Sequence, residues 1–150
     1  MQRSARFAAA FLLAALTGCG EDETPRDVDV TIGTASISAR TDPPDGLATL
    51  DATIEMDATV DLSGAEVLEA RITALPSGPE LTFDINVRGP MDGTTIDLPA
   101  NEVVVARVTN AGTTNAELAE FCGAAVSFEV TVEAEGIERS ASRDVTVSCS

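Results

Sequence analysis

The stretch Leu50–Leu62, LDATIEMDATVDL, decides the fold of this 150-residue chain. Every second residue in it is apolar, and the residues between are polar or charged. One face would carry Leu50, Ala52, Ile54, Met56, Ala58, Val60 and Leu62, and the other Asp51, Thr53, Glu55, Asp57, Thr59 and Asp61. Such alternation predicts a β-strand with one face on a hydrophobic core and the other in water, as antiparallel sheets provide.

On both sides of this strand, turn-forming residues separate further alternating runs. A first strand is expected from Val28 to about Ala39, followed by a turn at 41–46, TDPPDG. Later strands are expected at 81–87, with Asp84 and Asn86 facing outward, at 96–98, at 103–108, at 124–132 and at 145–149. Residues 113–120 favour one or two helical turns, with Thr114 or Asn115 as the N-cap.

About seven or eight short strands with regular turn signals predict an all-β fold. We expect an antiparallel β-sandwich with Greek-key connections and one short helical turn, and a small β-barrel is the alternative. The helical corner before Cys122 resembles the corner that precedes the sixth strand of immunoglobulin-like domains. This resemblance implies an immunoglobulin-like or fibronectin-III-like architecture.

Two hairpin registers follow from the turn residues. A three-residue loop at Ser63-Gly64-Ala65, with Gly64 left-handed, would pair residues whose numbers sum to about 128. The apolar residues of 68–72 would then lie beside those of 56–60, and Arg71 would face Asp57 on the solvent side. This pairing requires both strands to belong to one sheet.

The second hairpin involves the two cysteines of the C-terminal region. A two-residue loop at Glu135-Gly136 pairs residues whose numbers sum to about 271, which places Val126 against Val145 and Cys122 against Cys149. We therefore expect a structural disulfide between these cysteines. The same register puts Arg143 opposite Phe128 and Arg139 opposite Val132, so that the hairpin tip is expected to leave the core or to contain a bulge.

The N-terminus has the features of a secretory signal peptide. Residues 1–6 contain two arginines and no acid, and Phe7–Leu16 is a ten-residue apolar run. A membrane span needs about 20 apolar residues, so this run is too short to remain as an anchor. A cationic start, a short apolar core and small residues at its end are typical of a cleaved leader.

The last residues of the apolar run, Leu16-Thr17-Gly18-Cys19, resemble the lipobox of bacterial lipoproteins. The resemblance implies cleavage before Cys19, a diacylglyceryl thioether on its sulfur and an acyl group on its amine, and such multiple acyl chains anchor a protein stably. By analogy with Gram-negative sorting, Gly20 permits delivery to the outer membrane, whereas Glu21-Asp22-Glu23 could equally be a surface-export signal. The expected organisation is a signal peptide at 1–18, an acidic tether at 19–27 and a sandwich at 28–150.

Composition excludes several activities. Loss of the leader leaves seven arginines against 25 acidic residues, a net charge of −18, which repels nucleic acid. The chain has no His, Lys, Tyr or Trp, so it cannot form a Ser-His-Asp triad, a Cys-His pair or a Schiff base. A zinc site is excluded on the same grounds, because only two thiols remain besides Cys19. A hydrolase based on two carboxylates stays chemically feasible.

We therefore expect a lipid-anchored envelope protein with a non-enzymatic binding or scaffolding domain. Its partners would be the membrane, through Cys19, and an unidentified envelope protein, with no nucleic acid and no cofactor. The alternatives are a calcium-dependent adhesion or stabilisation module and a small carboxylate-based hydrolase. We assign no catalytic or metal-binding residues, because the acidic pairs Asp27 and Asp29, Asp42 and Asp45, and Asp92 and Asp97 lack the spacing of a calcium loop.

Overall fold

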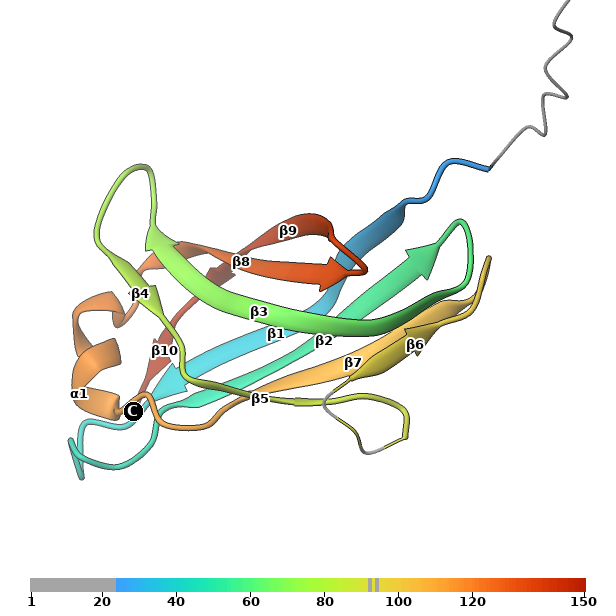
Figure 1. Ribbon diagram of the computed structural model, residues 1–150. Coiled ribbons are helices and arrows are strands. Elements are labelled where there is room, and N and C mark those ends of the chain that lie inside the picture. The colour runs from blue at the N-terminus through green and yellow to red at the C-terminus, as the bar shows by residue number, and fades with distance from the viewer. Residues whose placement is uncertain (1–23, 92, 94) are drawn as a thin grey trace, which may run out of the picture.

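A computed structural model of the chain describes residues 24–150, except for positions 92 and 94. This part of the chain consists of strands and one short helical corner (Figure 1). The strands are β1 (Val28–Ala39), β2 (Thr49–Ala58), β3 (Leu62–Ala74), β4 (Glu80–Thr82), β5 (Ile85–Arg88), β6 (Ile96–Leu98), β7 (Val103–Asn110), β8 (Ala125–Ala134), β9 (Ile137–Thr146) and β10 (Ser148–Cys149). The corner is formed by α1 (Asn115–Leu118) and the 3-10 turn Ala119–Phe121.

The strands form two facing sheets. The first sheet has the order β10-β1-β2-β7-β5, and the second has the order β4-β3-β8-β9, with β6 also paired to β3. In their order across each sheet, β1-β2-β7-β5 and β3-β8-β9 correspond to the A-B-E-D and C-F-G sheets of an immunoglobulin domain. The all-β, antiparallel, immunoglobulin-like sandwich with one short helical turn is therefore confirmed, and the barrel alternative is wrong.

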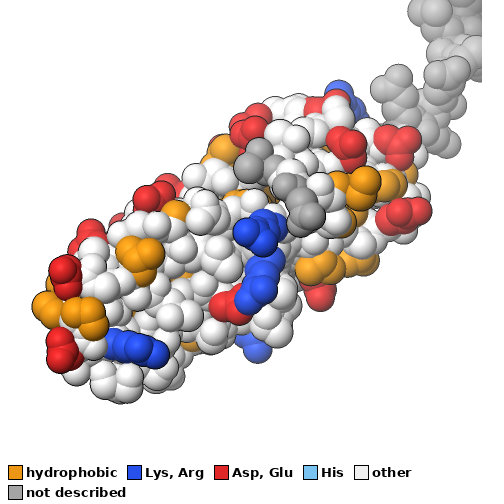
Figure 2. Space-filling model, turned by 90° about the horizontal axis from the view of Figure 1, so that it is seen from below, with side chains coloured by type: hydrophobic (Ala, Val, Ile, Leu, Met, Phe, Trp, Pro, Cys, Tyr) orange, Lys and Arg blue, Asp and Glu red, His pale blue; other side chains and the backbone are white. Residues whose placement is uncertain are grey.

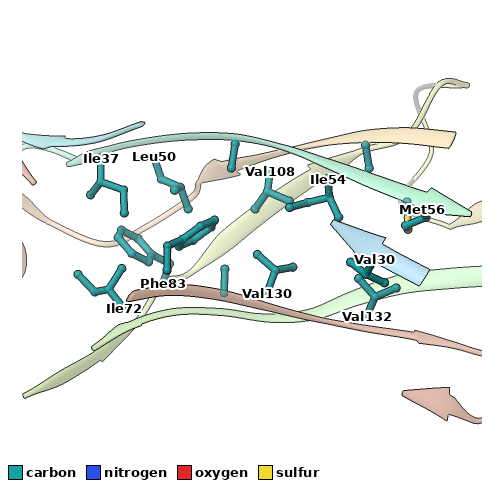
Figure 3. Close-up of a cluster of buried hydrophobic side chains, with 14 of the residues drawn as sticks. Val30, Ile37, Leu50, Ile54, Met56, Ile72, Phe83, Val108, Val130 and Val132 are labelled. Carbon is teal, nitrogen blue, oxygen red and sulfur yellow. The ribbon is translucent and has the colours of Figure 1, made fainter. Parts of the chain in front are cut away.

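The core lies between the sheets and is almost entirely aliphatic (Figure 3). Ile54 of β2, Ile72 of β3 and Val130 of β8 are fully buried. Burying such a side chain contributes about 1.5–3 kcal/mol. The alternation of the sequence therefore has its expected cause, which is that one face of each central strand packs against the opposite sheet.

The alternating stretch that predicts one long strand is divided between the sheets. β2 ends at Ala58, and after a short crossing the chain begins β3 at Leu62. The predicted hairpin of β2 with β3 is therefore wrong, because β2 pairs with β1 and β7 while β3 pairs with β4, β6 and β8. Gly64 does have a positive φ of 65°, but it lies in an irregular part of β3 opposite β6.

The predicted strand 81–87 is divided in the same way. β4 ends at Thr82 in the second sheet and β5 begins at Ile85 in the first. Between them, Phe83 is buried in the core. Its backbone N–H donates to Ala70 O at 2.8 Å, while the N–H of Asp84 donates to the hydroxyl of Thr113 at 3.1 Å. Both amides thus remain hydrogen-bonded where the chain changes sheets. The alternating pattern of 81–87 continues through this crossing, so the pattern alone does not reveal it.

The C-terminal hairpin has the predicted register. Ala134 pairs with Ile137, Val126 with Val145, and the pairing continues without a shift along both strands. The two loop residues, Glu135 and Gly136, have φ values of 47° and 83°, as a type I′ turn requires at both central positions. The expectation that the tip leaves the core or is bulged is wrong, because Val132 and Ala134 are buried and the ladder is regular.

Candidate functional site

The predicted lipidation site, Cys19, lies outside the described residues, as do the signal peptide and Gly20-Glu23. The structure begins with residues that contact the sandwich. Arg26 forms an ion pair with Glu135, and Asp27 forms one with Arg139 at 2.8 Å. The hydroxyl of Thr59 bonds to the Pro25 carbonyl. Residues 25–27 of the predicted tether are therefore bound to the β-hairpin end of the domain.

The predicted disulfide joins Cys122 to Cys149, with a Cα–Cα distance of 5.5 Å. It links the helical corner to β10, the last strand, which pairs in parallel with the end of β1 at Ala39. The bond from Val147 N–H to Ala124 O, at 3.0 Å, keeps the β8–β9 register, whereas Gly123 N–H donates to the carbonyl of the same Val147 at 2.8 Å. The pairing therefore shifts by one residue at Gly123, which has a φ of 74°, just before the cysteines. The disulfide lies at the opposite end of β1 from the entering chain.

The helical corner begins with a capping box, the motif in which the cap and the third helical residue bond each other's backbone. Thr114 is the N-cap, one of the two predicted positions, and its hydroxyl accepts the N–H of Glu117 at 3.3 Å. In return the Glu117 carboxylate accepts the backbone N–H of Thr114 at 2.7 Å and its hydroxyl at 2.9 Å. These hydrogen bonds to the ionised form hold the pKa of Glu117 below its usual value.

The second predicted cap residue, Asn115, has a different role that sequence reasoning missed. Its side chain is 3% exposed. Its amide oxygen accepts the N–H of Arg40 at 2.9 Å, and its amide nitrogen donates to Pro43 O at 3.0 Å. Asn115 thus joins the corner to the loop after β1. An Asn beside a cap is an ordinary sequence signal, so nothing local marks this long-range contact.

Arginines and carboxylates form pairs across both outer faces. Arg107 of β7 binds Asp51 of β2 through two hydrogen bonds of 2.8 and 2.6 Å. The bond from this guanidinium lowers the pKa of Asp51 and raises that of Arg107. On the other sheet Arg71 binds Glu129 at 2.6 Å. The predicted contact of Arg71 with Asp57 is wrong, because these residues belong to different sheets.

β9, at an edge of the second sheet, carries Arg139 and Arg143 at positions whose partners on β8 are buried. Both side chains reach across to the first sheet, Arg139 to the residue just before β1 and Arg143 to β1 itself. Arg139 pairs with Asp27, and the guanidinium of Arg143 donates to the carbonyl of Gly33. Gly33 lies at the register shift of β1, and a Cβ there would lie 2.9 Å from the hydroxyl of Thr53. The predicted register places both arginines on the core side of β9. This unusual position is the sequence signal that they have polar partners outside their own sheet.

Two open grooves lie at the ends of the sandwich. A groove of about 450 Å³ at the entry end is lined by Asp61, Asp97 and Glu135 among other residues. Two of these carboxylates are engaged, because Asp61 accepts the N–H of Ala100 at 2.8 Å and Glu135 pairs with Arg26. A groove of about 500 Å³ at the far end is lined by Arg40, Asn115 and neighbouring loop residues.

The acidic pairs considered from the sequence are not brought together into a cluster. Asp27 pairs with Arg139, and Asp92 lies outside the described residues. Among residues 24–150, positions 92 and 94 aside, no group of three His, Cys, Asp or Glu side chains could hold a metal ion. The same range contains no helix with the length and apolar character to cross a membrane. Where a carboxyl pKa is displaced, at Asp51 and Glu117, it is lowered.

Comparisons with known proteins give only distant structural similarity. No protein-family model and no curated protein sequence matches the chain. A family 123 glycoside hydrolase from Clostridium perfringens has a TM-score of 0.45 and 11% identity, over 82% of this chain and 27% of that one. AggA, the major subunit of aggregative adherence fimbriae type I from Escherichia coli, has a TM-score of 0.38 and 10% identity, over 83% and 96%. The chain thus spans about a quarter of the hydrolase, and similarity at this level carries no conclusion about function.

Proposed function

We propose that this chain is a lipid-anchored protein of the bacterial envelope whose sandwich binds or scaffolds another envelope protein. The mature protein begins at Cys19, which carries the acyl chains, and the membrane to which it is delivered is the outer membrane. The domain itself performs no catalysis. The observation that carries the proposal is the leader, in which Leu16-Thr17-Gly18-Cys19 closes a ten-residue apolar run after a cationic start.

The beginning of the described structure supports an anchoring role. The chain is bound to the domain from Pro25 onward, through Thr59, Glu135 and Arg139. Only residues 20–24 then separate the acylated cysteine from the sandwich. Five extended residues span at most about 18 Å, so the entry end is held close to the lipid surface. The opposite end, with the disulfide and the corner, points away from the membrane.

The side-chain chemistry supports a non-enzymatic role. An acid-base hydrolase requires one carboxyl group whose pKa is raised, so that it can donate a proton near neutral pH. Asp51 and Glu117 are both displaced in the other direction, by Arg107 and by Thr114. These two carboxylates serve an ion pair and a helix cap. Both side chains are held in the ionised form, which stabilises the sandwich and cannot donate a proton.

The test is fractionation of cells that express the full chain. Wild-type protein should be in the membrane fraction and should leave it only with detergent, whereas Cys19→Ser should appear in the soluble envelope fraction or remain as an uncleaved precursor. The matched control is Cys122→Ser with Cys149→Ser, which removes two thiols from the domain and should stay membrane-bound. Equal membrane association of Cys19→Ser and wild type would contradict the proposal.

A further inference from the structure

One part of the outer face of the first sheet combines exposed aliphatic side chains with unpaired carboxylates. Val103 and Val105 of β7 point to solvent, with 62% and 46% of their surface exposed. In the register of β2 with β7, Asp57 lies directly opposite Val103, and Glu55 lies directly opposite Val105. On the other side of β2, Asp29 of β1 lies opposite Asp57. We call these five residues the valine–carboxylate face.

The carboxylates of this face form no ion pair in the described part of the chain, and Arg107, the next outward residue of β7, binds Asp51 instead. The ion pairs there involve other acids: Asp27, Asp51, Glu69, Glu129 and Glu135. Like charges placed directly opposite each other, such as Asp29 and Asp57, destabilise a sheet. Figure 2 shows red and orange side chains at both ends of the molecule, and blue ones over its middle and near its left-hand end. The outer face of the first sheet thus combines two unfavourable features, repulsion between neighbouring carboxylates and exposure of two valines to water.

We propose that the valine–carboxylate face binds a basic segment of the partner protein, with arginine or lysine stems lying on the two valines. Long basic side chains can cover apolar surface with their methylene groups while their charged ends reach outward. Neighbouring strands are about 4.8 Å apart, so a stem on Val103 or Val105 brings its cationic end to Asp57 or Glu55 on the adjacent strand. An arginine can bind such a carboxylate through two hydrogen bonds.

Charge complementarity selects this occupant over other choices. A second copy of the chain would bring the same carboxylates to the face, in a protein of net charge −16, and anionic lipid headgroups would be repelled as well. A purely apolar segment would desolvate Asp57 and Glu55 without compensation. A basic segment would neutralise the carboxylates and cover the exposed valines at the same time. The inference rests on the proposed role of the sandwich as a binding module, and it names the surface and the chemistry of the partner.

The test uses the full chain in a neutral detergent and a fluorescent peptide of alternating arginine and valine. Peptides of alternating glutamate and valine, and of alternating arginine and serine, serve as ligand controls. One variant is Glu55→Gln with Asp57→Asn, and another is Val103→Thr with Val105→Thr, which keeps the β-branched shape. The matched control is Glu133→Gln with Glu138→Gln, which removes the same charge from the outer face of the second sheet, where these residues pair.

The arginine–valine peptide should bind, and its affinity should fall about threefold to tenfold with either first-sheet variant. Affinity for the second-sheet control should stay within about twofold of wild type. An equal loss of affinity in the first-sheet variants and the second-sheet control would indicate attraction by net charge alone and would contradict the proposal. Absence of binding would also contradict it, as would equal binding of the arginine–serine peptide. Because the readout does not depend on acylation, a failure here leaves the anchoring proposal standing, and the reverse also holds.

Discussion

Individual polar residues determine where the strands end and how their connections are held. Asn115 is buried and bonds to two points of the loop after β1, so it fixes a connection that the alternating pattern leaves undefined. Thr114 and Glu117 fix the start of the corner by bonding to each other's backbone. Each of these residues satisfies groups that would otherwise be buried or frayed without a partner. Their effect on stability is therefore local and measurable.

Removing the cap should cost a defined amount of stability. Thr114→Ala removes the hydroxyl that accepts the Glu117 N–H, and we expect the free energy of unfolding to fall by about 1 kcal/mol in urea titrations. Thr114→Ser keeps an oxygen at the same position and should lose less than half of that. An alanine variant as stable as wild type would show that the capping box does not stabilise the corner.

Acid should weaken the fold through Asp51 and Glu117. Both pKa values are lowered in the folded protein, so below their unfolded values, which are near 4, the unfolded chain binds more protons. The stability that these carboxylates contribute is complete above that pH and is lost as pH falls through the folded values. Asp51→Asn with Glu117→Gln should therefore flatten the dependence of stability on pH between about 5 and 3. An unchanged slope would contradict this assignment.

Among the elements, the sequence predicts local pairings well and distant ones poorly. The β8–β9 register follows from Glu135-Gly136, because a two-residue type I′ loop leaves one pairing. The β2–β3 pairing fails because the alternation of 50–62 is the same whether the chain turns within a sheet or crosses to the facing one. For the same reason the alternation of 81–87 does not reveal the break between β4 and β5. Of the candidate sites, Cys122 and Cys149 could be paired from the register, whereas the valine–carboxylate face depends on the distant partner strands of β2.

The disulfide should add stability without determining the fold. Chain entropy assigns about 3.6 kcal/mol to a loop of this length as an upper value, and the β8–β9 hairpin already brings the ends together. Cys122→Ser with Cys149→Ser should therefore lower the free energy of unfolding by less than this and leave the backbone amide spectrum largely unchanged. Global unfolding of the variant at room temperature would contradict the prediction.

We expect the arginines of β9 to protect an edge strand from pairing with another chain. Charged side chains on the core side of an edge strand disfavour pairing with another chain. Arg139→Val with Arg143→Val should complete an apolar stripe on β9 and promote association, which light scattering during concentration of the protein would detect. Arg139→Gln with Arg143→Gln keeps polar side chains and should associate less than the valine variant. Equal behaviour of both variants and wild type would contradict this role.

At the scale of the whole molecule, the two ends of the sandwich have different surroundings. The entry end holds residues 25–27 and the turn at Glu135-Gly136, and the far end holds the disulfide and the capped corner. In the proposed arrangement the first end faces the lipid, and the valine–carboxylate face lies on the outer side of the first sheet close to that end. The high negative charge then disfavours binding of anionic lipid headgroups to the domain and attracts a basic partner.

The most direct test of the account is mass spectrometry of the N-terminal peptide, from protein extracted from its native membrane in detergent. We predict a mature chain that begins at Cys19, with a diacylglyceryl group on its sulfur and an acyl group on its amine. A mature chain that begins at another residue, or one that begins with an unmodified Cys19, would contradict the central claim.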